Sequence, residues 1–455
     1  MDYSQHATTD VVREDFPHTK KKIYMNNGSI APTPVSTIKA ITDAFLKYSI
    51  EGPDSKAVNE FIISLMDELR RRVAALINSE PEEIIFTQST TEGLNYIRNG
   101  IDWKRGDSVV VRGGTHEHYA NYLPWLQLSR EKKVSLINLP INETGYFDMA
   151  ELENVLRRGK RTGTKTGATT SRTSKTPRLI TLSHALYNNG ALMPVNEVGK
   201  ITRSNDVLFC IDAAQTVGSI EIDVKRIGCD FMAFPAFKWI CGPLGLGILY
   251  CRKKAAEELK PQSIGSESAT LSSDQKTLAY LEPPIKFQTG FRNFPALAGL
   301  EASVRYLLRI GLSNIRSMNL KVANTLRTEL EKIAGVKLYG PGDESLRTSI
   351  VSFSSAEVDS KTITDKLEEN EIIFAERNIG SGRKGVRASP HFFNSEAEVM
   401  RAVVGHVVIG GDDVARARPE RVDSLPHHPR HLLARLLVDL GRAEGHPRDE
   451  ARGAA

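Results

Sequence analysis

Seven short apolar runs alternate with amphipathic stretches between residues 82 and 252, and this alternation limits the fold more than any other feature. Each run is rich in Ile, Val, Leu and Phe and is bounded by turn residues, as β-strands are. Helical patterns lie between several runs, for example at 90–101 and 194–205. This order predicts an α/β fold with a mostly parallel sheet covered on both faces. The runs are EEIIFTQS, DSVVVRGG, KVSLINLP, RLITLSHA, VLFCIDAA, CDFMAFPA and GLGILYCR.

The pattern changes after about residue 285. Residues 295–334 show apolar positions at three- and four-residue spacing and predict one long helix, and shorter strand and helix patterns follow. We therefore expect an N-terminal arm over 1–21, a large α/β domain over 22–285 and a smaller C-terminal α+β domain over 286–410.

Two segments differ from the rest in composition. Residues 157–178 hold eight basic residues and no acidic one, which predicts a flexible insertion; a polyanion-binding arm with salt-dependent binding is the functional alternative. Residues 411–455 contain eight Arg and no Lys, and predict an appended tail that is disordered or forms one helix. A metal role for the HHPRH stretch at 427–431 is the lesser alternative, so we expect no metal site.

Composition and cysteine usage narrow the class of protein. Cys210, Cys229, Cys241 and Cys251 lie in or beside apolar stretches and form no CxxC pair, which argues against a disulfide framework or zinc site. The sequence shows no signal-peptide core and no apolar run that would span a bilayer. The net charge of +5 is weak evidence for nucleic-acid binding. We expect a cytoplasmic, soluble protein that binds neither membrane nor nucleic acid.

One lysine has unusual surroundings. Lys238 lies between Phe237 and Trp239 in the apolar run FPAFKWICGPLGLGILY, so its amine either reaches water or reacts with something in a pocket. Asp212 ends an apolar strand, and ligands of open α/β sheets bind at the carboxyl ends of strands. Thr90 opens a helix after another strand, and a helix N-terminus binds anions.

These groups together match the needs of pyridoxal 5′-phosphate (PLP). A lysine amine forms a Schiff base with the aldehyde, and an aspartate pairs with the protonated pyridine nitrogen. Hydroxyls and helix amides hold the phosphate. A flat side chain stacks on the ring, and His118 follows a further strand in a suitable position.

Seven stretches in one order carry a resemblance to a known family. The sequence resembles the class V aminotransferase family, fold-type I PLP enzymes that include cysteine desulfurases, isopenicillin N epimerase and cystine C–S lyases. The SHALYNNGALMPV stretch is more similar to the lyase and epimerase branch. The matching stretches, from about residue 22 to 405, are YMNNGSIAPTP, FTQSTTEGLN, EHYANYLPW, LSHALYNNGALMPVNEV, CIDAAQTVGSIEIDVKRIGCDFMAF, KWICGPLGLGILY and VRASPHFFNSEAEV.

The resemblance implies a role for each matching residue. Lys238 is the Schiff-base lysine and moves the Cα proton, while His118 stacks on the ring. Arg387 clamps the substrate carboxylate, which suits its planar fork. The implied cofactor-binding residues are Lys238, Asp212, Gln215, His118, Thr90, Thr91 and Asn188, and the implied substrate-binding residues are Arg387, Asn27 and Arg377.

Three positions depart from the family's phosphate site. The family usually has Ser-x-His before the lysine, and here Pro235 and Phe237 stand in those places. Phe291 replaces a threonine that reaches the phosphate from the partner subunit, with Arg292 beside it as an alternative ligand. These changes predict a weakened phosphate site, and they keep open the alternative of a non-catalytic relative.

The implied chemistry acts at Cα or Cβ of an α-amino acid through a quinonoid. Elimination, as in C–S lyases, or transamination is the reading that we favour, and the alternatives are an amino-acid epimerase or a cysteine desulfurase-like enzyme without the persulfide cysteine. Desulfurases carry a persulfide cysteine before the carboxylate-binding arginine; here no cysteine follows Cys251, which weighs against that activity. The resemblance also implies a homodimer with a shared active site and a small-molecule amino-acid substrate.

Overall fold

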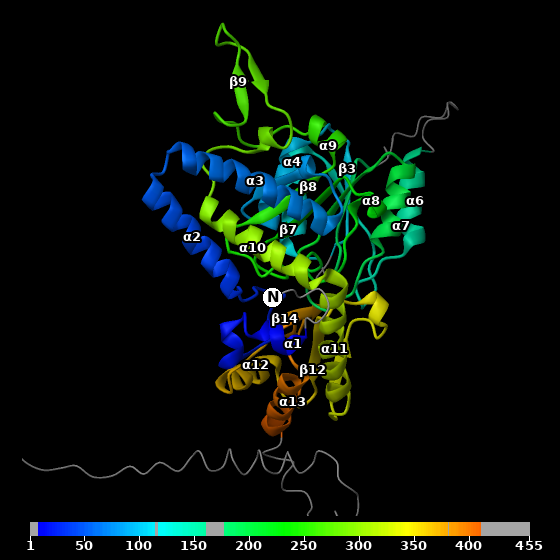
Figure 1. The fold of residues 1–455 in the computed structure, drawn as a ribbon. Coiled ribbons are helices and arrows are strands. Elements are labelled where there is room, and N and C mark those ends of the chain that lie inside the picture. Colours follow the sequence, from blue (N-terminus) through cyan, green and yellow to red (C-terminus); the bar gives the residue numbers. More distant parts are fainter. Residues whose placement is uncertain (1–7, 114–116, 161–176, 381, 411–455) are drawn as a thin grey trace, which may run out of the picture. The chain divides into compact units, whose positions relative to one another are not determined.

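A seven-stranded sheet forms the centre of the protein (Figure 1). The computed structural model describes residues 8–113, 117–160, 177–380 and 382–410. The strand order is β2-β8-β7-β6-β5-β3-β4, and β8 alone runs antiparallel to its neighbours. All seven predicted strands are confirmed: β2 (Ile84–Thr87), β3 (Ser108–Val111), β4 (Ser135–Asn138), β5 (Leu179–Ser183), β6 (Leu208–Asp212), β7 (Phe231–Pro235) and β8 (Gly247–Cys251).

Helices cover both faces of this sheet, as the apolar runs predict. Alternate residues of a strand point to opposite faces. Ile84 and Phe86 therefore belong to the core on one face, together with residues of α3 (Lys56–Ile77), α7 (Val195–Ser204), α8 (Val224–Ile227) and α10 (Phe294–Ile310). Ile85 belongs to the core on the other face, together with residues of α4 (Thr90–Gly100), α5 (Tyr119–Lys132) and α9 (Lys253–Glu258). Figure 1 shows α3 and α10 beside each other over β7 and β8.

The predicted long helix is interrupted. The chain forms α10 and then α11 (Leu312–Glu331), because Gly311 between them has a φ of +85°, which no helical residue adopts. The expectation of one continuous helix over 295–334 was therefore wrong.

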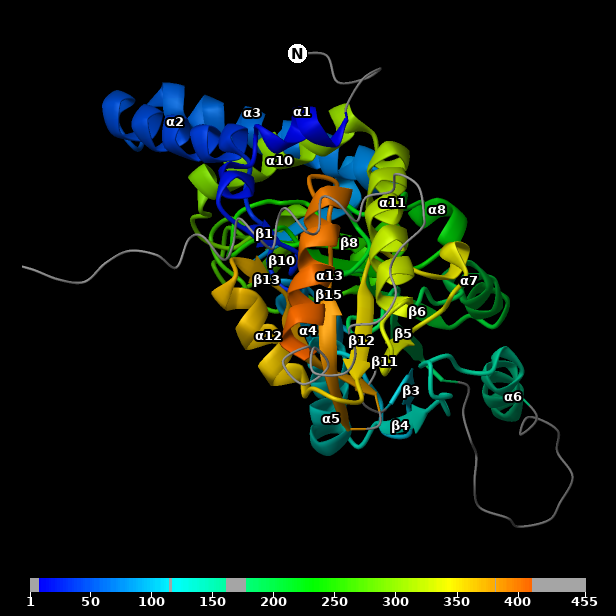
Figure 2. The same cartoon turned by 90° about the horizontal axis from the view of Figure 1, so that it is seen from below.

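A second, antiparallel sheet follows, in the order β11-β12-β15-β14. Its strands are β11 (Val336–Tyr339), β12 (Val351–Ser355), β14 (Ala375–Gly380) and β15 (Arg383–Ala388). The helices α11, α12 (Ser360–Glu369) and α13 (Glu396–Gly410) pack side by side with it, as Figure 2 shows.

The N-terminal residues are tied to this second sheet region. α1 (Thr9–Arg13) is fixed by an ion pair of 2.8 Å between Arg13 and Glu398. The short strand β1 (Ile23–Tyr24) pairs with β13 (Ile372–Ile373). Residues up to 410 form one compact unit, and the division into arm, large domain and small domain stays a prediction.

The remaining elements lie at the surface. α2 (Val35–Glu51) packs on α10, and a hairpin of β9 (Ala269–Leu271) and β10 (Leu278–Tyr280) projects from the body. α6 (Met149–Lys160) includes the first residues of the expected insertion 157–178. Residues 161–176 of that insertion and the expected tail 411–455 lie outside the described residues. Within the described part of the chain, no helix is both long and apolar enough to span a membrane.

Candidate active site

A cavity lies at the edge of the large sheet where the parallel strands end. Its empty volume is about 500 Å³, and it opens to solvent. Because β2, β3, β5, β6 and β7 all run in one direction, the segments that follow them converge at this edge. The lining residues are Ser89, Thr90, Thr91, His118, Ala120, Ser183, Ala185, Tyr187, Asp212, Ala214, Gln215, Pro235, Phe237 and Lys238.

Six of the ten predicted site residues line this cavity, and each comes from the end of a strand or from the segment that follows it. Asp212 is the last residue of β6, and Lys238 follows β7 by three residues. The cavity-lining set is Thr90, Thr91, His118, Asp212, Gln215 and Lys238. The other four lie outside the lining: Asn27, Asn188, Arg377 and Arg387. Asn188 is fully buried, and its carbonyl accepts a hydrogen bond of 2.5 Å from the hydroxyl of Ser352.

The pKa values of Lys238 and Asp212 both differ from the usual values of these side chains. Burial lowers the pKa of the Lys238 amine to about 8; the Asp212 charge opposes this shift, and the charges of Arg387 and Arg377 add to it. Burial also raises the pKa of Asp212 to about 6, although its Oδ1 accepts a hydrogen bond of 2.9 Å from the amide of Ala214. A large share of the lysine amine is therefore neutral near pH 8.

His118 caps α5, since its Nδ1 accepts a hydrogen bond of 3.1 Å from the amide of Ala120. Its ring lies 5.1 Å from that of Tyr187, edge to face. Poor hydration in the cavity, followed by the charge of Lys238, lowers the pKa of His118 to about 4. The ring is thus neutral at physiological pH.

Gln215 is held between two fixed groups. Its Nε2 donates to the carbonyl of Gly28 at 2.9 Å, and its Oε1 accepts from Nε1 of Trp239 at 2.9 Å. Trp239 is fully buried, and its carbonyl lies 3.0 Å from Nε2 of His391. The tryptophan beside Lys238 therefore positions a cavity side chain, a role that the sequence analysis missed.

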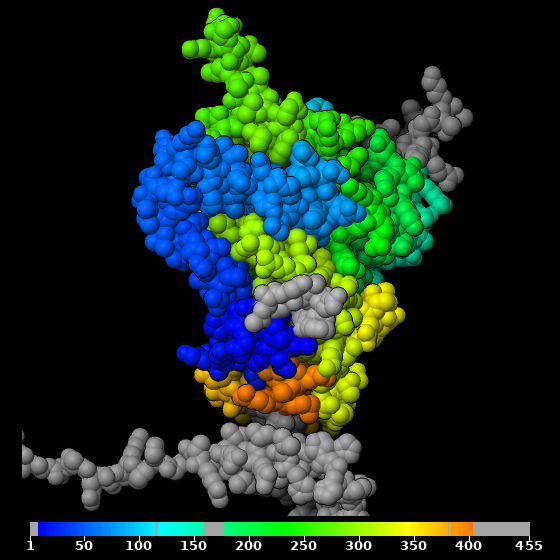
Figure 3. All heavy atoms as spheres, viewed as in Figure 1, coloured from blue at the N-terminus to red at the C-terminus, as the bar shows by residue number. Residues whose placement is uncertain are grey.

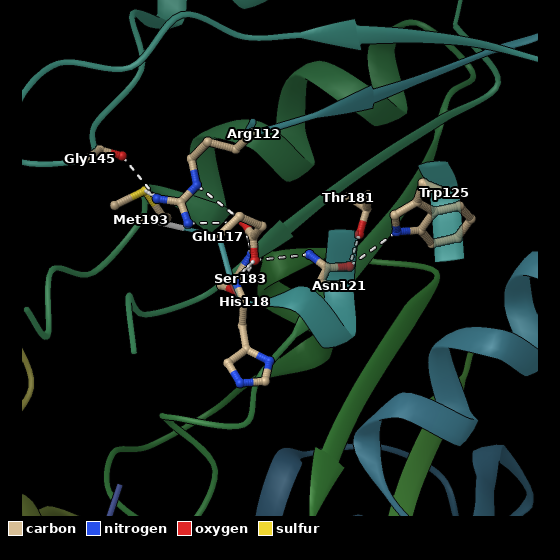
Figure 4. Close-up of polar contacts among 9 residues, drawn as sticks. All are labelled: Arg112, Glu117, His118, Asn121, Trp125, Gly145, Thr181, Ser183 and Met193. Atoms are coloured by element: carbon tan, nitrogen blue, oxygen red, sulfur yellow. Dashed lines mark hydrogen bonds and ion pairs between the residues drawn. The ribbon is translucent and has the colours of Figure 1, made fainter. Parts of the chain in front are cut away.

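The second omission is a buried ion pair beneath the cavity (Figure 4). Glu117 bonds Arg112 at 2.9 Å, and both side chains are almost fully buried. The same carboxylate accepts from the hydroxyl of Ser183 and from Nδ2 of Asn121 at 3.3 Å. This network joins β3, β5 and the start of α5, and so sets the position of His118. The available signal was a pair of opposite charges, Arg112 and Glu117, five residues apart and shortly before His118.

Two predicted arginines lie together. Nη2 of Arg387 and Nη2 of Arg377 each donate to Oγ of Ser29 at 2.6 Å. Arg387 also donates to the carbonyl of Tyr187 at 2.8 Å. Nδ2 of Asn27 donates to the carbonyl of Ser389 at 2.9 Å, which holds this loop against β15.

The structure places the three residues that depart from the family's pattern. Pro235 and Phe237 both line the cavity and offer it no side-chain donor. Phe291 is 94% exposed, and Arg292 donates to the carbonyls of Phe86 and Phe287, both at 3.2 Å. Arg292, which we expected as an alternative ligand of the phosphate, is not among the described residues that line this cavity.

The raised pKa of Asp212 predicts a pH-dependent cost to stability. The folded protein keeps this proton up to about pH 6, whereas the unfolded chain loses it near 3.8. The contribution of the protonated Asp212 to the free energy of unfolding is therefore fully present below pH 3.8, and it is lost as the pH rises through 6. We expect Asp212→Asn to stabilise the protein by about 2 to 3 kcal/mol at pH 8. Urea unfolding at pH 8 and pH 4 measures the difference, which should disappear at pH 4.

The buried ion pair gives a second prediction. Glu117→Gln leaves the guanidinium of Arg112 without its carboxylate, so we expect a loss of about 3 to 5 kcal/mol in the free energy of unfolding. The control is Asp43→Asn, which breaks an exposed pair with Lys39 and should change stability by less than about 1 kcal/mol. Equal effects of the two variants in urea unfolding would contradict the assigned importance of the buried pair.

Comparison with known proteins agrees with this geometry. The family pattern "Aminotransferase class-V" matches residues 23–404. A probable cysteine desulfurase of Methanothermobacter thermautotrophicus is 31% identical over 405 residues, covering 86% of this chain and 96% of that protein.

Solved structures show the same fold. The apo cysteine desulfurase of Thermococcus onnurineus NA1 matches with a TM-score of 0.80 and 27% identity, over 90% of this chain and 100% of that one. The cystine C–S lyase C-DES, in complex with its product cysteine persulfide, matches with a TM-score of 0.75 and 26% identity, over 86% and 98%. A C-DES mutant with glycine linked to its PLP cofactor matches with a TM-score of 0.76. The chain has the fold-type I architecture and belongs to the class V aminotransferase family of PLP enzymes.

Proposed function

We propose that this chain is a PLP-dependent enzyme that breaks a bond at Cα or Cβ of an α-amino acid, with β-elimination of the C–S lyase type as the favoured outcome. One observation carries the proposal. The amine of Lys238, with a pKa of about 8, faces the same cavity as Asp212 and the N-terminus of α4. A non-catalytic relative would have no need to keep these groups together.

The donors in the cavity fit the parts of the cofactor. Lys238 provides the amine for its aldehyde, and Asp212 the carboxylate for its ring nitrogen. His118 provides a flat neutral ring, and Thr90 and Thr91 provide amides at the start of a helix for its phosphate. When bound, PLP supplies an electron sink for the charge that develops at Cα.

Lys238 acts as the base in this proposal. Its lowered pKa leaves much of the amine neutral near pH 8, so it can accept the Cα proton and later return it. Asp212 carries its charge above pH 6 and stabilises the proton on the ring nitrogen of the cofactor. Gln215, fixed by Gly28 and Trp239, orients the ring oxygen.

The phosphate end relies on α4. Ser89 caps the helix through the amide of Glu92, at 3.1 Å, and also lines the cavity. Gly247 allows the close approach of this turn, since a Cβ there would lie 2.7 Å from the backbone of Ser89. With Pro235 and Phe237 in place of polar residues, we expect weaker cofactor binding than a polar site would give.

Thiol positions favour elimination over persulfide formation on the enzyme. All four cysteines of the sequence are buried and unpaired, and none lines the cavity. Burial raises the pKa of Cys241 far above its usual range, so it forms no thiolate at physiological pH. Free thiols also suit a reducing compartment, and we propose the cytoplasm as the location.

Apolar residues exposed on α2 and nearby segments support the proposal of a homodimer. The loop at 243–244 lies near α2, since a Cβ at Gly299 would contact both Ile41 and Pro243. Figure 3 shows α2 on the surface of the protein. Exposed apolar side chains of this kind are typical of an interface, and most soluble homo-oligomers are symmetric dimers. The exposed residues are Val35, Ile38, Phe45, Leu46, Ile50, Ile63, Leu244 and Phe291.

Reconstitution with PLP tests the proposed function. We expect the wild-type protein to give an absorption band near the visible edge, and Lys238→Ala to lack it, because this amine makes the covalent bond. Absence of the band at saturating PLP would overturn the proposal. Product analysis with cysteine or cystine then separates outcomes: pyruvate and ammonia, formed together with sulfide from cysteine or with cysteine persulfide from cystine, indicate elimination, whereas a need for an amino acceptor indicates transamination.

Size-exclusion chromatography with light scattering tests the dimer. At micromolar concentration we expect twice the mass of 50.3 kDa. Ile38→Glu should shift the protein toward monomer, because it places a charge in the apolar surface. Leu346→Glu, at an exposed position on another part of the molecule, is the matched control and should stay dimeric. A cofactor-bound wild-type monomer would exclude the shared active site.

A further inference from the structure

His391 connects the region of the second sheet to the loop that carries Lys238. It follows β15 by three residues and is fully buried. Its Nε2 lies 3.0 Å from the carbonyl oxygen of Trp239, and its ring lies 5.0 Å from the indole ring, edge to face. Within the described part of the chain, His391 is the one hydrogen-bond donor to this carbonyl. The backbone one residue after Lys238 is therefore held by a side chain from the other sheet region.

Gly218 encloses the same carbonyl from a second side. Its φ is +93°, and a Cβ at this position would lie 2.5 Å from the carbonyl oxygen of Trp239. A side chain there would displace the carbonyl, and the backbone angle also favours glycine. Burying a carbonyl without a donor is unfavourable, so the hydrogen bond from His391 and the space left by Gly218 together fix how this backbone lies.

The position of the proton on His391 follows from its two partners. A carbonyl oxygen only accepts, so Nε2 carries the hydrogen that bonds Trp239. Burial lowers the pKa of His391 to about 3, so the ring is neutral and Nδ1 has a lone pair. One end of the Asn319 amide lies 3.1 Å from Nδ1, and the other end lies 3.4 Å from the hydroxyl of Ser219. The hydrogen bonds decide which end is nitrogen, and they place the nitrogen beside Nδ1.

The backbone at Trp239 joins two groups of the cavity. Lys238 is its neighbour in the chain, and the carbonyl of Lys238 accepts a hydrogen bond of 2.8 Å from the amide of Cys241. The indole Nε1 of Trp239 donates to Gln215 at 2.9 Å. Both Lys238 and Gln215 line the cavity, whereas His391 does not. A shift of the Trp239 backbone would therefore move the lysine amine and the glutamine amide together.

We propose that His391 is a positioning residue for Lys238 and Gln215: its Nε2–H holds the carbonyl of Trp239 and thereby sets where the amine and the amide lie in the cavity. The inference rests on the proposed function and adds to it a residue outside the cavity. His391 acts only through Trp239. Such placement matters because a displacement of about 1 Å at a reacting group lowers a rate by as much as ~100-fold.

Two substitutions separate the hydrogen bond from the space that the ring fills. His391→Gln keeps an N–H near the position of Nε2, whereas His391→Leu removes it. With the PLP-loaded protein and cysteine as the substrate probe, we expect His391→Leu to lower kcat roughly tenfold to a hundredfold. KM should stay within about threefold of the wild-type value, because Arg387 is unchanged. His391→Gln should restore most of kcat, and equal kcat values for the two variants would overturn the proposal.

Two measurements on the protein without cofactor do not depend on turnover. Nitrogen-15 NMR of histidine-labelled protein, with the His391 signals assigned by their loss in His391→Gln, should show the proton on Nε2. Carbon-13 reductive methylation reports the pKa of the Lys238 amine, assigned by loss of its signal in Lys238→Ala. We expect that pKa to rise by about one unit in His391→Leu, as water reaches the loosened amine, and to stay unchanged in His391→Gln.

A matched variant separates positioning from a loss of stability. Phe393→Leu removes a buried ring that lies 5.6 Å from that of His391 and leaves the bond to Trp239 in place. It should destabilise the fold in urea about as much as His391→Leu, without changing kcat or the pKa of Lys238. Equal changes in the Lys238 pKa for these two variants would show a merely structural role. If His391→Leu does not fold, a wild-type proton on Nδ1, or a loss of kcat in Phe393→Leu, would still overturn the proposal.

Failure of the proposed function gives a different pattern. If no PLP band forms, but the proton lies on Nε2 and His391→Leu raises the pKa of Lys238, the proposed function is wrong and the positioning role stands. If the band forms and all variants share the wild-type kcat and Lys238 pKa, only the role of His391 is rejected.

Discussion

The common direction of β2, β3, β5, β6 and β7 is the constraint on which the site depends. Parallel strands end at one edge, so the residues that follow them meet there although they are far apart in sequence. Lys238, Asp212 and Thr90 reach one cavity for this reason. β8 runs the other way and places Gly247, which has no side chain, against the turn that begins α4. The sheet therefore both collects the functional groups and leaves room for the helix turn among them.

Buried polar groups beneath the cavity hold this arrangement in place. Glu117 and Arg112 join two strands to the start of α5, and Trp239 joins the loop after β7 to Gln215. Such groups are expensive to bury and are tolerated only when each is satisfied. The charges at the cavity differ: Asp212 accepts a hydrogen bond from the amide of Ala214, and within the described residues Arg377 and Arg387 donate only to neutral groups. Stability and ligand binding are thus assigned to separate sets of charges.

Much of the fold and part of the site could be predicted from sequence. Apolar runs of four to eight residues with turn residues around them identify buried strands, and all seven were found. Gly311 breaks the helix that periodicity alone extended over 295–334, because periodicity ignores the backbone angle of one residue. Glu117 was overlooked because a glutamate beside a histidine looks like any loop residue until the fold buries it against Arg112, five residues earlier and directly after β3.

The sequence by itself showed where the seven apolar runs lie along the chain and that one lysine stands in an apolar segment. It also showed that Pro235 and Phe237 stand in place of polar residues and that no cysteine lies near Arg387. These are properties of residue type and local order, which need no folding to be read. Only the tertiary structure decided that all four thiols are buried and that two arginines share Ser29. Burial and the approach of distant charges depend on how the two sheets and their loops pack, and local sequence carries no record of those distances.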